Sequence, residues 1–233
     1  MEIEYKNQNN NLQKDLVEKF EIDHVYENQP IKRTLDQPNL SNKQSLLENL
    51  KNKILQVSDC ELKKNSKQIV FNDGDNQSSI MIVGEGPGQK EDEIGKPFVG
   101  DAGILLNKML EAIKIQRPKI YITNVVNYRP PNNRKPEPSE INRYSVFLRE
   151  HINIIDPKIL ILMGSTAMEA LFGQNLKISK ERGKWKDLIV NKKTYQTILT
   201  FHPAYLLRQP DQKKYSWADL KMIRKRLDEL GIN

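Results

Sequence analysis

Four short apolar runs recur along the chain, and each is followed by polar residues, glycine or proline. They cover residues 80–83, 121–123, 159–163 and 197–200. Short runs that are rich in β-branched residues and end at turn formers are typical of buried strands. We therefore predict four strands, each with a polar cluster at its carboxyl end.

Helical patterns separate these strands. Apolar residues recur at three- and four-residue spacing over residues 41–56, 102–115, 139–155, 166–172 and 218–230. Strands that alternate with helices predict a parallel sheet with helices on both faces. The expected fold class is α/β, with three α/β/α layers around a central four-stranded, mostly parallel sheet. Residues 69–71 and 188–190 are candidates for extra edge strands.

The N-terminal segment differs in composition from the rest of the chain. Residues 1–40 are poor in hydrophobic side chains, and the first 50 residues contain 13 Asn or Gln. Such a segment buries too little apolar area to offset its ordering entropy. We predict a flexible polar arm over residues 1–40, with a short helix around 10–20, and a folded domain over residues 41–233.

Several features bear on where the protein works. No apolar run approaches the roughly 20 residues of a membrane span, and residues 1–11 lack the apolar stretch of a signal peptide. The single cysteine, Cys60, allows no internal disulfide, which fits a reducing compartment. We expect a soluble, cytoplasmic protein that is a monomer.

The charge is unevenly distributed. The net charge is +7, but the first 50 residues hold nine acidic and six basic residues, so the remainder carries +10. A basic body favours a polyanionic partner, nucleic acid first. A lysine-rich composition without any functional meaning explains the same excess, so charge alone leaves both interpretations open.

Polar residues that follow different strands are candidates for one site. Glu85, Asn124 and His202 each come at or just after the end of a predicted strand. Because parallel sheets bind ligands at the carboxyl ends of their strands, we expect these three side chains to meet in one crevice. The glycine-rich turn at 84–88 lacks the Gly-Lys-Ser/Thr ending of a phosphate-binding loop, which disfavours a nucleotide-binding enzyme. Phe98, between a proline and a glycine-bounded turn, is suited either to stack on a base or to plug its loop.

Three segments of the chain resemble a known family. They are GEGPGQKEDEIGKPFVGDAGILLNKML at 84–110, YITNVVNYRPP at 121–131 and FHPAYLLR at 201–208. In content and order they are similar to the signature motifs of the family 4 uracil-DNA glycosylases, within the uracil-DNA glycosylase superfamily. The similarity extends over residues 57–230, and a glutamate at position 85 suits family 4.

The resemblance implies an enzyme that flips uracil out of DNA and hydrolyses its N-glycosidic bond, without a metal in the chemistry. It places Glu85 near the sugar, where a carboxylate stabilises positive charge and positions the attacking water. It places His202 at a uracil oxygen, as a hydrogen-bond donor to the developing negative charge. The implied substrate contacts are Gly86, Glu91, Phe98 and Asn124, with Asn124 reading the uracil edge and Phe98 stacking on the base.

The resemblance also suggests how DNA is held. Leu206 or Leu207 is the candidate wedge that fills the space left by the flipped base. Arg129, Arg134 and Arg208 are candidate phosphate contacts, which position the duplex without reading its sequence. An ordinary solvated basic surface is the alternative interpretation of each arginine.

The chain departs from the family at one cofactor site. Family 4 members typically bind a [4Fe–4S] cluster through four cysteines, and the corresponding positions here hold Val57, Cys60, Tyr128 and Tyr144. Because a cluster needs several thiolates, we expect no iron–sulfur cluster and no other cofactor. We hypothesise that the two tyrosines fill the emptied volume.

The prediction is therefore a monofunctional uracil-DNA glycosylase of base-excision repair, acting on double- or single-stranded DNA. Two alternatives stay open. One is a glycosylase for another deaminated base, because the shape of the pocket decides the lesion. The other is a non-catalytic DNA-binding module of the same fold, which the degraded cluster site favours.

Overall fold

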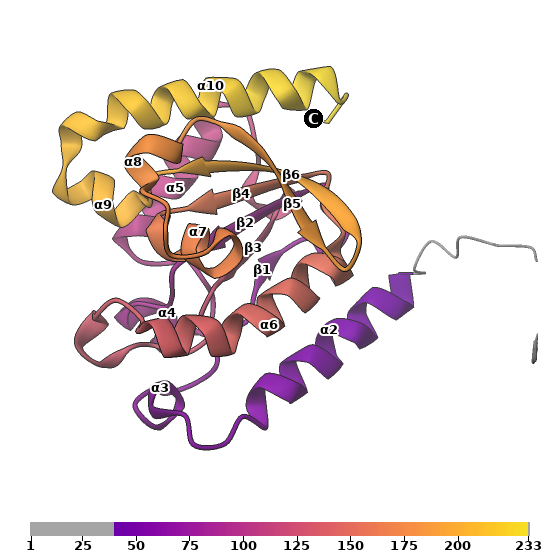
Figure 1. The fold of residues 1–233 in the computed structure, drawn as a ribbon, viewed down its shortest axis with the longest axis vertical. Coiled ribbons are helices and arrows are strands. Elements are labelled where there is room, and N and C mark those ends of the chain that lie inside the picture. Colours follow the sequence, from indigo (N-terminus) through magenta and orange to yellow (C-terminus); the bar gives the residue numbers. More distant parts are fainter. Residues whose placement is uncertain (1–39, 233) are drawn as a thin grey trace, which may run out of the picture. The chain divides into compact units, whose positions relative to one another are not determined.

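The computed structural model describes residues 40–232 (Figure 1). The predicted polar arm up to residue 39, with its short helix around 10–20, lies outside the described residues. The described part begins with helix α2 (Leu40–Leu55), which confirms the helix expected at 41–56.

A six-stranded sheet forms the centre of the domain, in the order β1-β3-β2-β4-β6-β5. Its four inner strands are mutually parallel and confirm the four predicted runs: β2 (Ile80–Gly84), β3 (Tyr121–Asn124), β4 (Ile159–Met163) and β6 (Lys193–Thr200). Two antiparallel strands, β1 (Asp73–Gly74) and β5 (Trp185–Val190), extend the edges, so the sheet has two strands beyond the predicted central four.

The two expected edge strands have different outcomes. Residues 188–190 belong to β5, as predicted. Residues 69–71 form no strand, and the first edge strand is β1 instead. The reason is a pair of hydrogen bonds to a distant residue: the Val70 amide donates to the Asn127 carbonyl at 2.8 Å, and the Asn127 side-chain amide donates to the Val70 carbonyl at 3.1 Å. These groups are therefore used outside the sheet ladder.

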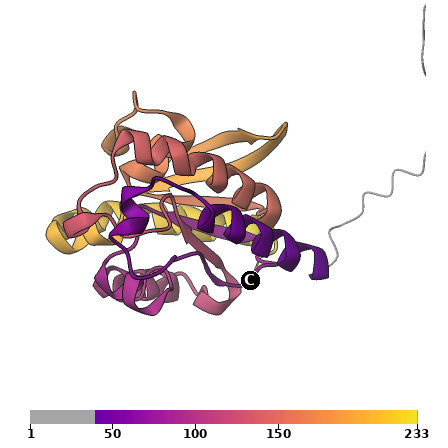
Figure 2. The ribbon, with the colours of Figure 1, turned by 90° about the horizontal axis from the view of Figure 1, so that it is seen from below.

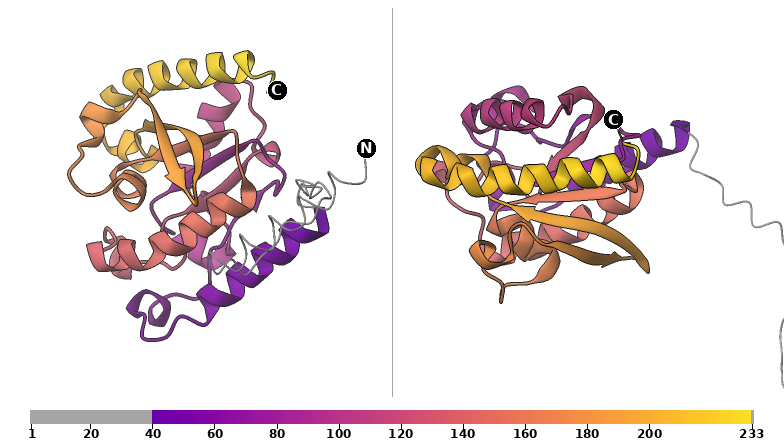
Figure 3. Two further views of the ribbon diagram at one scale, coloured as in Figure 1. Left: turned by 45° about the vertical axis from the view of Figure 1, so that its right-hand side comes forward. Right: turned by 90° about the horizontal axis from the view of Figure 1, so that it is seen from above.

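Helices cover both faces of the sheet, which confirms the three layers (Figures 2 and 3). Side chains along a strand alternate between faces. Met81 and Val83 of β2 pack on α2, α6 (Pro138–Ile155) and α7 (Ser165–Phe172), and Ile80 and Ile82 pack on α5 (Asp101–Ala112) and α10 (Lys213–Glu229). Both faces are thus buried, as the continuous apolar runs predicted.

Two helix boundaries lie several residues from those that the apolar spacing predicts. Helix α5 ends at Ala112 rather than at residue 115, because Lys114 has a left-handed backbone with φ 57°. Helix α10 begins at Lys213, five residues before the predicted start at 218, and Ser216 in this added turn is buried. The shorter helical segments are α3 (Glu61–Lys64), α4 (Gln89–Ile94), η1 (Arg117–Lys119), η2 (Pro131–Asn133), α8 (Ile178–Glu181), α9 (Pro203–Arg208) and η3 (Pro210–Gln212).

The strand register brings the carboxyl ends to one edge. Gly84 pairs with Asn124, and Met163 pairs with Thr200. Residues that directly follow the parallel strands therefore share this edge, where α7 and α9 begin (Figure 1). Among residues 40–232, no helix is both long and apolar enough to cross a membrane.

Candidate functional site

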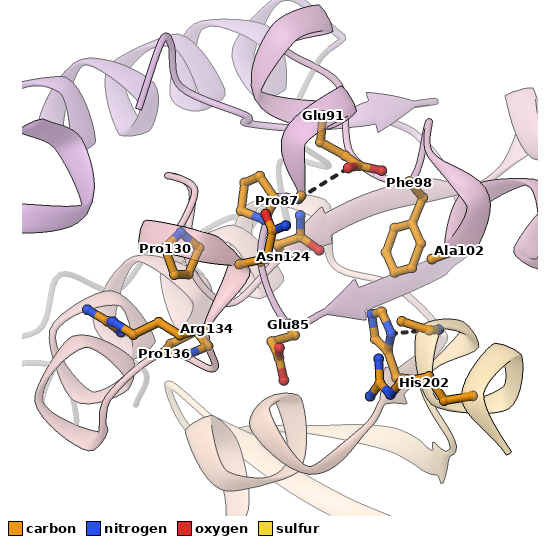
Figure 4. A pocket seen from close by; sticks show the side chains of 15 residues that line it. Glu85, Pro87, Glu91, Phe98, Ala102, Asn124, Pro130, Arg134, Pro136 and His202 are labelled. Carbon is orange, nitrogen blue, oxygen red and sulfur yellow. Dashed lines mark hydrogen bonds between the residues drawn. The ribbon is translucent and has the colours of Figure 1, made fainter. Parts of the chain in front are cut away.

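A hollow of about 210 Å³ opens at the carboxyl edge of the sheet (Figure 4). Glu85, Asn124 and His202 all line it, so the structure brings together the three residues that the strand pattern placed in one crevice. Five further predicted site residues line the same hollow: Gly86, Glu91, Phe98, Arg134 and Arg208.

Glu85 lies on the turn that follows β2 and is only partly exposed. The hydroxyl of Thr166, a fully buried residue in the first turn of α7, donates a hydrogen bond to Glu85 Oε2. This bond fixes one carboxylate oxygen and thereby the orientation of the other. Sequence reasoning missed Thr166, whose signal was its position three residues after the end of β4.

His202 begins helix α9 as its N-cap. Its Nδ1 accepts a hydrogen bond from the Ala204 amide at 3.2 Å, so the neutral ring carries its proton on Nε2. Burial, with a smaller effect from the charge of Arg208, lowers the pKa of His202 to about 4. At neutral pH the side chain is therefore an uncharged hydrogen-bond donor through Nε2.

Phe98 packs against His202. The two ring centroids are 5.4 Å apart with an interplanar angle of 28°. Gly84, which precedes Glu85 in the sequence, has no room for a side chain, because a Cβ there would lie 2.5 Å from the Phe98 ring. The glycine at the end of β2 thus lets the aromatic ring reach the hollow.

Arg117 holds the backbone of the Phe98 loop. Its guanidinium donates to the Phe98 carbonyl at 3.0 Å and to the Pro97 carbonyl at 2.7 Å, and it pairs with Asp73 at 3.0 Å. Phe98 itself has φ 53°, a conformation that needs such support in a residue other than glycine. Sequence reasoning missed Arg117, which no local motif marks.

The carboxylate of Glu91 is engaged by backbone. Its oxygens accept hydrogen bonds from the amides of Gly88 at 3.1 Å, Val99 at 2.9 Å and Gly100 at 2.8 Å. Glu91 therefore joins the glycine-rich turn to the Phe98 loop. Because both carboxylate oxygens accept backbone hydrogen bonds, Glu91 stabilises the two loops that form this wall of the hollow.

Asn124 ends β3 and is almost fully buried. It also lines the hollow. Its side-chain amide carries both a hydrogen-bond donor and an acceptor that can meet a ligand there.

The sequence matches a known family over most of the part that the structure describes. The family model described as the uracil DNA glycosylase superfamily matches residues 71–225. The chain belongs to this superfamily. A type-4 uracil-DNA glycosylase of Thermotoga maritima is 41% identical over 71% of this chain and 85% of its own. One from Sulfurisphaera tokodaii is 40% identical over 76% and 83%. A type-5 enzyme of Pyrobaculum aerophilum is 28% identical over 42% and 50%.

The superfamily assignment confirms the resemblance seen in the sequence motifs, and the type-4 relatives match more of the chain than the type-5 relative does. A DNA polymerase of Bacillus phage SP01 is also similar, with 32% identity over 66% of this chain and 16% of the polymerase. A segment similar to this superfamily member thus occurs within a much longer polymerase chain.

The two leucines predicted as wedges differ in exposure. Leu206 is 1% exposed and packs in the core beside α5 and α10, whereas Leu207 is 43% exposed. Successive helical residues point about 100° apart, so α9 cannot present both to solvent. Burial disfavours Leu206 as a DNA contact, so Leu207 is the better placed of the two candidates.

The three predicted arginine contacts lie in different settings. Arg134 forms a two-pronged pair with Glu140, at 2.8 and 2.7 Å, which raises its pKa. Arg129 donates to the Asn133 side chain at 2.8 Å and does not line the hollow. Arg208 is exposed at the rim. Of the three, Arg208 is the most available to a phosphate, because Arg134 is already neutralised.

The four residues that the family resemblance puts at iron–sulfur ligand positions, Val57, Cys60, Tyr128 and Tyr144, all belong to one hydrophobic core cluster or pack against it. The Cys60 sulfur lies 3.3 Å from the Tyr144 hydroxyl, and the Tyr128 and Tyr144 rings meet edge to face with centroids 6.5 Å apart. Val57 packs on the same core. One thiol surrounded by buried side chains does not fit a cluster that needs several thiolates. Within residues 40–232, no group of three or more His, Cys, Asp or Glu side chains is arranged to hold a metal ion.

Proposed function

We propose that this protein excises uracil from DNA by hydrolysing the N-glycosidic bond, leaving free uracil and an abasic site. The observation that carries the proposal is the convergence of Glu85, Asn124 and a neutral His202 on one hollow. The type-4 names of the relatives support the same activity.

The hollow suits a flipped pyrimidine. Its walls combine the Phe98 ring, which offers a stacking face, with the Asn124 amide, which offers one donor and one acceptor to the uracil edge. A base stacked in a duplex cannot reach side chains at the bottom of a sheet edge, so the nucleotide must leave the helix.

The chemistry follows from the two remaining groups. The bond between the sugar C1′ and uracil N1 breaks, and its electron pair leaves with the base. The Nε2–H of His202 stabilises the negative charge that develops on a uracil oxygen. The Glu85 carboxylate, held by Thr166, stabilises positive charge on the sugar and orients the water whose oxygen bonds to C1′. One proton of this water is lost as the hydroxyl of the abasic sugar forms, and the uracil anion takes up one proton to leave as free uracil.

We further propose that the protein works as a cytoplasmic monomer without an iron–sulfur cluster. Cys60 is the only cysteine in the chain, and its sulfur contacts the Tyr144 hydroxyl. In this proposal, the apolar packing of Tyr128 and Tyr144 joins the segment around Cys60 to the loop that carries Arg129, a role that an iron–sulfur cluster would otherwise fill.

A cleavage assay tests the proposed activity. The protein is incubated with a labelled oligonucleotide that contains one uracil, and abasic sites are then cleaved with alkali. We expect cleavage at uracil by the wild type, and its loss in Glu85→Ala and His202→Ala. Oligonucleotides with hypoxanthine or xanthine run in parallel, because cleavage only there would indicate the other lesion class. Tight binding without any cleavage would indicate a non-catalytic module.

A further inference from the structure

A second hollow, of about 340 Å³, adjoins the first. The two share Glu85, His202, Ala204 and Arg208, and the second is closed on its other side by Ile178 and Ser179 of α8. Because Glu85 and His202 line both hollows, the second hollow is within reach of the sugar and phosphate of a nucleotide whose base occupies the first.

Helix α8 lies in a basic segment. Residues 177–184 contain Lys177, Lys180, Arg182 and Lys184, and the three lysines are exposed. Within the described part of the chain none of these lysines forms an ion pair, whereas Glu181 is already paired with Lys186 at 2.8 Å. Among the described residues, the segment therefore presents three exposed lysines without an ion pair, and two of them flank Ile178 and Ser179 at the second hollow.

Arg182 anchors the segment to the strand that leads to His202. Its guanidinium bonds the carboxylate of Asp219, which is fully buried and also accepts a hydrogen bond from Thr200 at 2.8 Å. Gly183 has φ 69°, its amide donates to the Leu199 carbonyl at 2.8 Å, and a Cβ there would lie 2.5 Å from Asp219. The lysines thus project from a fixed support rather than from a free loop.

We propose that residues 177–184 form a phosphate clamp, in which Lys177, Lys180, Lys184 and the Ser179 hydroxyl bind the backbone of the DNA strand that carries the flipped nucleotide. This inference rests on the proposed function. Ile178 and Ser179 of the clamp line only the second hollow, whereas Arg208, the most available of the three arginines, lines both. Phosphate contacts from the clamp and from Arg208 would hold the strand while the base is out of the helix.

Two variants of equal charge separate a local clamp from general attraction. The clamp variant is Lys177→Gln, Lys180→Gln and Lys184→Gln together. The control variant carries Lys108→Gln, Lys221→Gln and Lys225→Gln, three exposed lysines on α5 and α10 whose neighbours in sequence line neither hollow. Both variants have three fewer positive charges on the surface, so thermal unfolding is expected to match the wild type in each. For each protein, KM, kcat and the Kd for the same duplex are measured across a salt series.

The clamp predicts a change in binding and not in the chemical step. In the clamp variant, KM at about 0.15 M salt should rise roughly tenfold. The slope of log K against log salt should fall by about 0.9 for each phosphate that the lysines no longer neutralise. The kcat should stay within about twofold of the wild type, because the reacting groups are untouched. The control variant should show neither the rise in KM nor the smaller slope.

The result that overturns the clamp is an equal KM and salt slope in the two variants. The proposed function can fail separately, if the wild type leaves uracil in place. In that case the Kd values decide: weaker binding confined to the clamp variant supports the clamp, and equal binding in both variants overturns it.

Discussion

Replacement of Tyr144 tests whether packing has taken over the role of the cluster. Tyr144 is fully buried, and its ring meets Tyr128 and Phe147 edge to face. Truncating a buried aromatic side chain to alanine costs about 3–5 kcal/mol, so Tyr144→Ala should lower the free energy of unfolding by that amount. Tyr144→Phe removes only the hydroxyl beside Cys60 and should cost about 1 kcal/mol.

Tyr128 supplies the matched control. Its hydroxyl is buried without a hydrogen bond to any residue between 40 and 232, so Tyr128→Phe removes an unsatisfied group and should be neutral or stabilising. Urea unfolding followed by fluorescence gives the free energies of unfolding of the wild type and the three variants. Iron and sulfide analysis of the purified wild type should find neither in stoichiometric amount. Equal stabilities for Tyr144→Ala and the wild type, or one cluster per chain, would refute the reasoning.

Three other predictions concern the site. Thr166→Val should lower kcat about tenfold, as removal of a hydrogen bond to a charged group does, with Thr166→Ser restoring it. The valine change should have no further effect in a Glu85→Ala background, as a double-mutant cycle would show. Leu207→Ala should weaken excision from duplex DNA without changing thermal stability, whereas Leu206→Ala should cost about 2–5 kcal/mol of stability. Since the pKa of His202 is about 4, the kcat/KM profile should show no histidine titration between about pH 5 and 8. The unfolded chain binds that proton below about pH 6.5, so the His202 contribution to stability falls as pH drops from there toward 4.

The strand pattern was enough to predict the class of fold and the place of the site. Buried parallel strands are marked by continuous apolar runs, and their polar residues follow at the carboxyl ends, so the order of residues alone placed Glu85, Asn124 and His202 together. The edge strands were harder to predict, because a strand of two residues such as β1 carries no periodicity of its own.

The supporting contacts depended on the tertiary structure. Thr166 reaches Glu85 across 81 residues of sequence, and Arg117 reaches the Phe98 carbonyl across 19. Such hydrogen bonds form only when distant segments pack together, so the residues next to Thr166 or Arg117 in the sequence do not predict them.

The same limit applies to exposure. Leu206 and Leu207 are adjacent, chemically identical and equally plausible wedges, and only the packing of α9 on the core turns one inward and the other outward. Residue type and motif order are local properties of the chain and so can be read from it. Which side chain is free to meet DNA is decided by long-range packing, since burial and ion pairing exist only once distant segments are in contact.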